Sequence, residues 1–233
     1  MKQVCTGFFG PVGENVLFED GDINVTHFVP SMLYLIRDGE EDYVVDTGFS
    51  DTQAQTRIYG LAFHRQDSYL DVLERVGIEP GKVKHLILTH LHWDHMANLA
   101  LFPNARIYCQ SVEYWRVLAE QDDVAETIRR AESRVMLVTE EYRLSPSIFL
   151  KRASGHTAGC QAVYVMDGEK RVCIAGDNVM CRENLESGRA VGLCQDLPGA
   201  RAFLEEMRRM EEQGDFECIC SHDYRQFKHG GER

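Results

Sequence analysis

Short apolar runs recur along most of the chain, and their composition predicts strands. In the first half, runs rich in β-branched and aromatic residues are bounded by Gly, Asp or Pro. The predicted strands there cover residues 23–29, 32–38, 42–48, 85–90 and 105–110. In the second half, the same pattern predicts strands over residues 147–153, 161–167, 170–177 and 216–223.

Three segments instead repeat apolar residues every three or four positions, which is the spacing of an amphipathic helix. Residues 70–78 have this spacing and meet Gly77, a common helix stop. Residues 111–121 begin with Ser111, a favourable N-cap, and residues 198–213 begin with a proline, which is favoured in a first helical turn.

The segment 122–140 is strongly charged, and VAETIRRAESRVM within it predicts either one exposed helix or a lid. Strands and helices are mixed along the chain, and we find no sequence repeat and no Ser/Pro-rich linker. We therefore expect a layered α/β fold, in which two packed β-sheets are covered by helices, in one domain spanning residues 1–233.

Composition narrows the classes of partner. The net charge of −12 argues against a nucleic-acid or anionic-membrane surface, because phosphates would be repelled at long range. The first residues lack the apolar core of a secretory signal, and no run reaches transmembrane length. We expect a small-molecule substrate and a monomer or homodimer. Eight scattered cysteines without a C-x-x-C pair predict reduced, mostly buried thiols in a cytoplasmic protein.

The densest chemistry lies in LILTHLHWDHMANL, residues 86–99, directly after a predicted strand. Polar residues also follow three later predicted strands, and loops from several strands can meet at one edge of a sheet. We therefore expect the following residues to form one site: His90, His92, Asp94, His95, His156, Asp177 and His222.

Five histidines and two aspartates exceed the roughly four donors of one tetrahedral zinc and suit two adjacent ions. Imidazole and carboxylate without thiolate favour zinc, with iron or manganese as alternatives. Two such ions can share a hydroxide, a strong nucleophile at neutral pH, and Asp177 could bridge them. Cys218 and Cys220 lie close to His222, but alternation in a buried strand explains them better than metal binding does.

The motifs THLHWDH, GHT, GD and SHD, in that order and preceded by VVDTG, resemble those of the metallo-β-lactamase superfamily from Asp46 to His222. The resemblance implies an αββα sandwich, with two mixed β-sheets flanked by helices. It also implies that Asp177 bridges two metals and that Asp46 supports the metal loop from outside. The ligands implied for the first metal are His90, His92 and His156, and for the second Asp94, His95 and His222.

Within that superfamily, the segment from THLHWDH to VEYW and the progression from DTG to ERVGIEP look most like N-acyl homoserine lactone lactonases, which quench quorum sensing. The resemblance implies that a metal-bridging hydroxide attacks a lactone carbonyl while one metal stabilises the oxyanion. Asp94 would be the catalytic residue that moves a proton to the leaving alkoxide.

One position departs from the lactonase pattern. Those enzymes commonly have a tyrosine three residues after the bridging aspartate, where this chain has Met180, which cannot donate a hydrogen bond. Tyr224 and His64 are the candidates to replace it. Residues 49–66 also form a short connection, which predicts a reshaped substrate pocket.

Other functions on the same ligand set stay open. The nearest alternative is a hydrolase of thioesters or phosphodiesters. A β-lactamase is disfavoured because a common form of its site has cysteine in place of Asp177, and a diiron redox protein because it usually has glutamate where His92 stands. A non-catalytic metal-binding module would bind two ions without turnover. Two zinc ions per chain would favour hydrolysis, whereas iron with a visible absorption band would favour redox chemistry.

Overall fold

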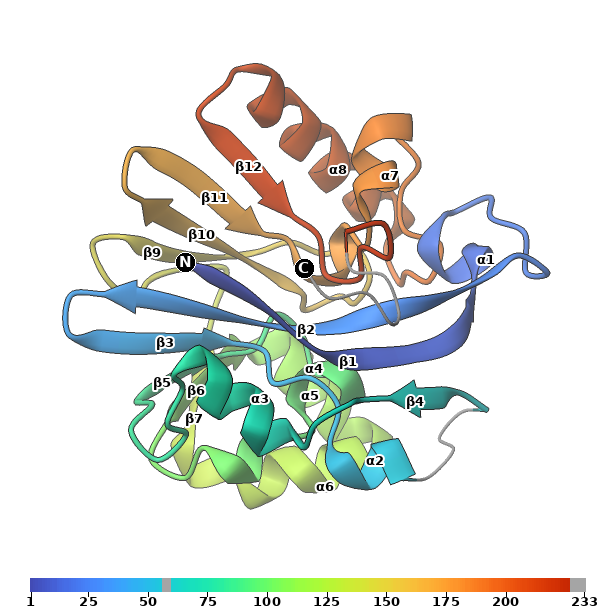
Figure 1. Ribbon diagram of the computed structural model, residues 1–233. Coiled ribbons are helices and arrows are strands. Elements are labelled where there is room, and N and C mark those ends of the chain that lie inside the picture. The colour runs from blue at the N-terminus through green and yellow to red at the C-terminus, as the bar shows by residue number, and fades with distance from the viewer. Residues whose placement is uncertain (56–59, 227–233) are drawn as a thin grey trace.

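The structure is a computed structural model that describes residues 1–55 and 60–226. Its strands form two sheets (Figure 1), one with the order β4-β1-β2-β3-β5-β6-β7 and one with the order β12-β11-β10-β9-β8. The first sheet contains β1 (Lys2–Gly13), β2 (Thr26–Asp38), β3 (Glu41–Val45), β4 (Ala62–His64), β5 (His85–Ile87), β6 (Arg106–Gln110) and β7 (Val135–Val138). The second contains β8 (Glu141–Arg143), β9 (Ile148–Arg152), β10 (Gln161–Asp167), β11 (Lys170–Ile174) and β12 (Phe216–Ile219).

Helices cover the outer face of each sheet, so the molecule has the four layers αββα (Figure 1). The larger sheet is covered by α2 (Asp51–Gln55), α3 (Tyr69–Val76), α4 (Trp93–Met96), α5 (Ser111–Glu120) and α6 (Asp123–Arg130). The smaller sheet is covered by α7 (Arg182–Ser187) and α8 (Leu197–Glu212), and α1 (Glu14–Leu17) follows β1. The predicted sandwich of two mixed sheets flanked by helices is confirmed.

The core between the two sheets follows from the alternation of side chains along each strand. On β11, Val172 and Ile174 face the opposite sheet, whereas Cys173 between them faces the layer of α8. On β12, Cys218 likewise packs in the α8 layer and Ile219 in the core between the sheets. Cys218 is therefore a core residue, as its position in a buried strand predicted, and burial raises the pKa of its thiol well above the usual value.

The predicted elements are mostly confirmed, with informative differences. Residues 23–29 and 32–38 are parts of one long strand, β2. The helix over 70–78 is α3, with a capping box at Ser68 and Gly77 in the left-handed conformation at its end. The prediction that Ser111 caps its helix is wrong, because Gln110 is the N-cap residue and Ser111 already lies in α5.

The prediction of one exposed helix or lid over VAETIRRAESRVM is confirmed only in its first part, because helix α6 ends at Arg130. Asp122 caps the short helix α6, which buries Ala125 and Ile128 against the larger sheet. The chain then forms β7, which pairs in parallel with β6. The four residues of β7, Val135–Val138, are all apolar and pair with β6 at the edge of the larger sheet. This apolar run forms a strand although charged residues surround it in the sequence.

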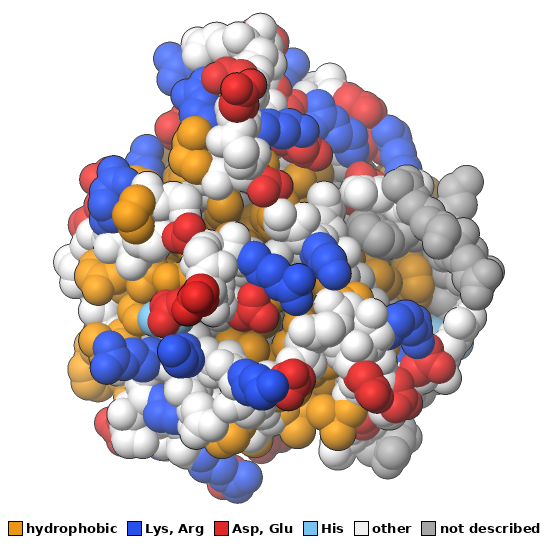
Figure 2. All heavy atoms as spheres, turned by 60° about the vertical axis from the view of Figure 1, so that its left-hand side comes forward, with side chains coloured by type: hydrophobic (Ala, Val, Ile, Leu, Met, Phe, Trp, Pro, Cys, Tyr) orange, Lys and Arg blue, Asp and Glu red, His pale blue; other side chains and the backbone are white. Residues whose placement is uncertain are grey.

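The charged side chains are mixed on the surface. Figure 2 shows one face, on which Lys and Arg side chains lie among Asp and Glu side chains, with apolar side chains between them. In the described part of the chain, every helix is too short or too polar to cross a membrane.

The core between the sheets predicts the effect of truncating a strand residue. Ile148 of β9 is fully buried there, so Ile148→Ala should lower the free energy of unfolding by about 2–5 kcal/mol. Met166 of the neighbouring strand is 48 % exposed, and Met166→Ala should change the free energy of unfolding by less than about 0.5 kcal/mol. Urea denaturation of both variants measures the difference, and equal losses would contradict this description of the core.

Candidate metal centre

All seven residues predicted for the site come together at one edge of the sandwich. The segment containing His90 to His95 follows β5, His156 follows β9, Asp177 follows β11 and His222 follows β12. Parallel pairing of β3 with β5, and of β11 with β12, brings the carboxyl ends of these strands to the same side. The site is therefore assembled by loops that leave rigid strands.

The ligand atoms divide into two groups, each of a kind that could hold a metal ion. Within each group the ligand atoms lie within 4.8 Å of one another. The first group, called the three-histidine group below, is His90, His92, His156 and Asp177, and the second, called the Asp94 group, is Asp94, His95 and His222.

Asp177 is placed between the two groups. Its Oδ2 atom lies 3.4 Å from His156 Nε2 and 3.8 Å from His90 Nε2. Its Oδ1 atom lies 3.2 Å from the Nε2 atoms of both His95 and His222. One carboxylate therefore presents one oxygen to each group.

Backbone carbonyls orient two of the histidines. His156 Nδ1 lies 2.5 Å from the carbonyl oxygen of Leu193, and His222 Nδ1 lies 2.7 Å from that of Pro30. A carbonyl can only accept, so each Nδ1 carries a proton and each Nε2 is turned toward Asp177. Such outer hydrogen bonds fix both the tautomer and the ring direction of a metal-binding histidine.

Asp46 supports the histidine loop from outside. Its Oδ1 accepts the backbone N–H of Thr89, and its Oδ2 accepts the Thr89 hydroxyl and lies near His95 Nδ1, each at 2.8 Å. The Thr89 hydroxyl oxygen is in turn 3.2 Å from His90 Nδ1. Asp46 has a φ of 57°, a conformation that costs a non-glycine residue free energy and that these three contacts hold in place.

The charges in the site differ between the two groups. Burial lowers the pKa of His90, His92 and His156, so their imidazoles are neutral at neutral pH. Burial acts the same way on His95 and His222, but the carboxylates of Asp177 and Asp94 outweigh it and raise both pKa values.

The two aspartates also differ. Burial alone would raise the pKa of Asp177, but the surrounding histidines hold it well below its usual value. For Asp94 burial prevails and raises the pKa of its carboxyl group. Asp177 is thus the stable anion of the site, whereas Asp94 is the carboxyl that takes up a proton more readily.

The site contains the unpaired polar atoms that a cation would satisfy. Among the described residues, none meets His90 Nε2, His95 Nε2 or Asp177 Oδ1 in hydrogen-bonding geometry, although all three atoms are buried and Oδ1 lies 3.2 Å from the Nε2 atoms of His95 and His222. Buried polar atoms without a partner are rare, and each calls for an ion or a water. Lone pairs of nitrogen and oxygen aimed at one small space fit two divalent metal ions of the zinc, iron or manganese type.

A cavity of about 300 Å³ opens onto both groups. Metal-group residues form its floor, and Trp93 and Met180 line it beside them. Trp93 also packs edge-on against Phe9 and Phe63, at centroid distances of 5.1 and 5.5 Å. The rest of the wall is apolar and comes largely from the first strand and helix: Phe9, Pro11, Val12, Gly13, Val16, Leu17, Val29, Leu61 and Leu193.

The two candidates to replace the missing tyrosine lie elsewhere. The Tyr224 hydroxyl donates to Glu183 Oε2 at 3.1 Å, and its ring stacks on His27. His64 is exposed on β4, next to Phe28. Neither Tyr224 nor His64 is among the described residues that line the cavity. The predicted shortening of segment 49–66 falls partly on 56–59, which lie outside the described residues.

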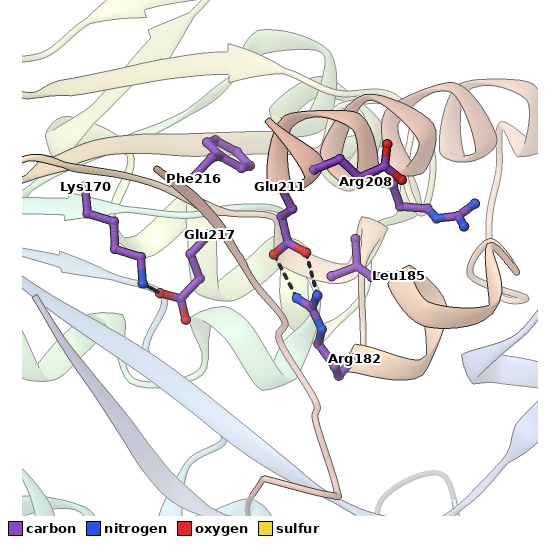
Figure 3. A pocket seen from close by; sticks show the side chains of 8 residues that line it. Lys170, Arg182, Leu185, Arg208, Glu211, Phe216 and Glu217 are labelled. Atoms are coloured by element: carbon purple, nitrogen blue, oxygen red, sulfur yellow. Dashed lines mark hydrogen bonds and ion pairs between the residues drawn. The ribbon is translucent and has the colours of Figure 1, made fainter. Parts of the chain in front are cut away.

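A second, larger cavity of about 500 Å³ lies between α7, α8 and β12 (Figure 3). Its charged side chains are largely paired with one another. Arg182 binds Glu211 through two hydrogen bonds of 2.7 and 2.5 Å, and Lys170 pairs with Glu217. None of the described residues that line this larger cavity belongs to the two metal groups, so the smaller cavity is the one next to the candidate metal centre.

Sequence reasoning missed most of the groups that surround the ligands. Asn178 holds the His156 loop, because its Oδ1 accepts the His156 N–H at 2.7 Å and its Nδ2 donates to the Ala153 carbonyl at 2.6 Å. The cavity wall from β1 was also missed, since Gly and Pro interrupt that strand. Its aromatic pair, Phe8-Phe9, was the available signal.

Comparisons with known proteins agree with this geometry. The model of the metallo-beta-lactamase superfamily matches residues 28–222. An N-acyl homoserine lactonase of Bacillus thuringiensis is 26% identical over 169 residues, covering 68% of this chain and 67% of the relative. One of Bacillus cereus is 27% identical over 171 residues, with 68% and 67% coverage.

Solved structures share the fold over nearly the whole chain. A quorum-quenching N-acyl homoserine lactone lactonase superposes with a TM-score of 0.82 at 20% identity, covering 97% of this chain and 92% of the other. The dizinc quorum-quenching lactonase AidC, in complex with a product, gives 0.74 at 15% identity, with 94% and 86% coverage. The chain belongs to the metallo-β-lactamase superfamily.

The different charge states predict different pH dependences of metal binding. The three-histidine group has neutral imidazoles, whereas metal binding to the Asp94 group must displace protons from His95 and His222. Lowering the pH below neutral should reduce the Zn²⁺ affinity of the Asp94 group by about tenfold per pH unit for each proton displaced. The Zn²⁺ affinity of the three-histidine group should fall less. Zn²⁺ titration calorimetry of the metal-free protein, in buffers of different ionisation enthalpy, counts the protons. Equal pH slopes for the two binding steps would contradict this assignment.

Proposed function

We propose that this protein is a dinuclear metal-dependent hydrolase that opens lactones of the N-acyl homoserine lactone type. One observation supports the proposal: two groups of side chains of the kind that could hold metal ions meet at Asp177, beside a largely apolar cavity. The similarity to N-acyl homoserine lactonases over two thirds of the chain supports the substrate class.

In this proposal the three-histidine group and the Asp94 group each hold one ion, and Asp177 bridges them. Zinc is the proposed metal, because imidazole and carboxylate donors suit it and because a solved relative with this fold is a dizinc enzyme. When bound, the two ions would supply a nucleophile at neutral pH and polarise the lactone carbonyl.

The protein's own residues then position the substrate and move the proton. Asp94 lines the cavity, with its Oδ2 atom 3.5 Å from His222 Nε2 and 3.6 Å from His95 Nε2. Because Asp94 lies at the cavity beside the other ligands, its carboxylate can take the proton of the nucleophile as the new C–O bond forms and give it to the ring oxygen that leaves as an alkoxide. Met180 lines the cavity but has no hydroxyl group, so no side chain at this position donates a hydrogen bond to the substrate carbonyl oxygen.

The apolar wall accounts for the rest of the substrate. Val12, Val16 and Leu17 come from the end of β1 and from α1, and Leu193 lines the cavity next to them. The backbone holds these segments together, since the Leu193 N–H donates to the Val16 carbonyl at 3.0 Å. An alkyl chain would leave water for this surface, whereas a charged phosphodiester would gain nothing from it.

Asp94 gives the first test of this function. The zinc-loaded protein should open N-hexanoyl homoserine lactone, and Asp94→Asn should lower kcat by about 100- to 10,000-fold, because the amide cannot transfer the proton. The amide keeps one oxygen for the metal, so metal content should stay near that of the unchanged protein. Lactone opening is measured by titrating the acid that the reaction releases. Equal turnover by the unchanged protein, Asp94→Asn and Asp94→Ala would exclude this role of Asp94.

The cavity wall gives the second test. Each added CH₂ that is buried should contribute up to about 0.8 kcal/mol, so kcat/KM should rise up to about fourfold per CH₂ from butanoyl to octanoyl homoserine lactone. Val16→Ala removes two wall carbons and should lower kcat/KM up to about tenfold for the octanoyl substrate, with little change for the butanoyl one. Ile23→Ala, at a residue 68 % exposed, is the control. A flat dependence on chain length would show that this wall does not bind the acyl group.

A further inference from the structure

Glu113 is a fully buried carboxylate that belongs to neither metal group. It lies in the first turn of α5 and is 0 % exposed. A buried charge is strongly unfavourable unless donors meet its oxygens. The donors around Glu113 therefore show what this residue holds together.

Two of those donors belong to metal-binding loops. Glu113 Oε1 accepts the backbone N–H of Leu91 at 3.1 Å, and Leu91 stands between His90 and His92. Glu113 Oε2 accepts the hydroxyl of Thr157, the residue after His156, at 2.8 Å. One carboxylate thus joins the two separate segments that carry all three histidines of the three-histidine group.

The remaining donor completes the charge balance. Arg116, one turn further along α5, donates from Nη2 to Oε1 at 2.6 Å and from Nε to Oε2 at 3.2 Å. Its Nη1 atom reaches Glu120 at the surface, at 2.6 Å. Each oxygen of Glu113 therefore meets one loop and one arginine nitrogen, so all four contacts need an acceptor.

The loop of His156 is packed tightly against this carboxylate. A Cβ atom at Gly159 would lie 2.3 Å from the backbone nitrogen of Glu113 and 2.5 Å from its Cβ. Only glycine allows this approach, so the separation between the loop and the start of α5 is fixed by contact as well as by hydrogen bonds.

We propose that Glu113 is a positioning residue that sets the distance between the His90–His92 segment and His156, and thereby the affinity of the three-histidine group for its metal. The inference rests on the metal ligands proposed above. The Asp94 group has separate supports, Asp46 and the Pro30 carbonyl, and is expected to be independent of Glu113.

Glu113→Gln tests the proposal with little change of volume. Because all four contacts are donors, the amide NH₂ must face at least one of them. The affinity of the three-histidine group for Zn²⁺ should fall by about 10- to 100-fold, the usual effect of losing an outer partner of a metal ligand. The affinity of the Asp94 group should change less than about twofold.

Two backgrounds assign the effect to one group. His222→Ala leaves the three-histidine group intact, and His156→Ala leaves the Asp94 group intact. Competition between the metal-free protein and a zinc chelator then gives one affinity in each background. Glu113→Gln should weaken binding in the His222→Ala background and leave it unchanged in the His156→Ala background. Equal weakening in both, or in neither, would overturn the proposal.

Glu120→Gln is the matched control. This substitution makes the same chemical change on the same helix. Glu120 accepts a hydrogen bond from Arg116, as Glu113 does, but its contact is at the surface, away from the loops of Leu91 and Thr157. The zinc affinities of this variant should equal those of the unchanged protein, and a loss as large as that of Glu113→Gln would also overturn the proposal.

A second pair of variants keeps the test valid if Glu113→Gln does not fold. Thr157→Val removes one donor and should weaken the three-histidine group, whereas Thr157→Ser keeps the hydroxyl and should restore it. No difference between these two would count against the proposal. Zinc affinity is read without substrate, so a protein that binds two zinc ions but opens no lactone would refute the proposed function alone.

Discussion

The placement of Asp177 between two groups of histidines is the constraint on which the rest of the site depends. Four imidazoles hold its pKa well below the usual value, so it remains an anion although it is buried. Its two oxygens face different groups at 3.2 to 3.8 Å. A buried carboxylate needs such compensation, and the loops that provide it are fixed by strands of both sheets.

The second layer of contacts explains why these loops keep their shape. Asp46, Thr89 and Asn178 use their side chains to hold the backbone or rings of the histidines, and Glu113 joins two loops that are far apart in sequence. Asp46 and Glu113 are buried and charged, and they cost free energy unless each contact is made. The stability of this edge of the sandwich and the precision of the metal groups therefore arise from the same hydrogen bonds.

Much of the fold, and the gathering of the seven predicted side chains at one edge of the sandwich, could be predicted from the sequence. Each ligand follows a short apolar strand, and the sequence order of His90 to His222 matches a known family. Local patterns failed where tertiary contacts decide: β1 contains Gly and Pro yet lies inside the larger sheet, and β7 is hidden in a charged segment. The role of Glu113 could not be predicted, because it depends on contacts 22 and 44 residues away in the chain.

We propose that a two-metal centre bridged by Asp177 acts beside an apolar cavity that suits an acyl chain, and that both metal groups are needed for lactone opening. The most direct measurement titrates zinc into the metal-free protein while the opening of N-hexanoyl homoserine lactone is followed. Activity should rise steeply only as the second equivalent binds and should stop rising at two per chain. Full activity at one equivalent, or no activity at two, would contradict the account.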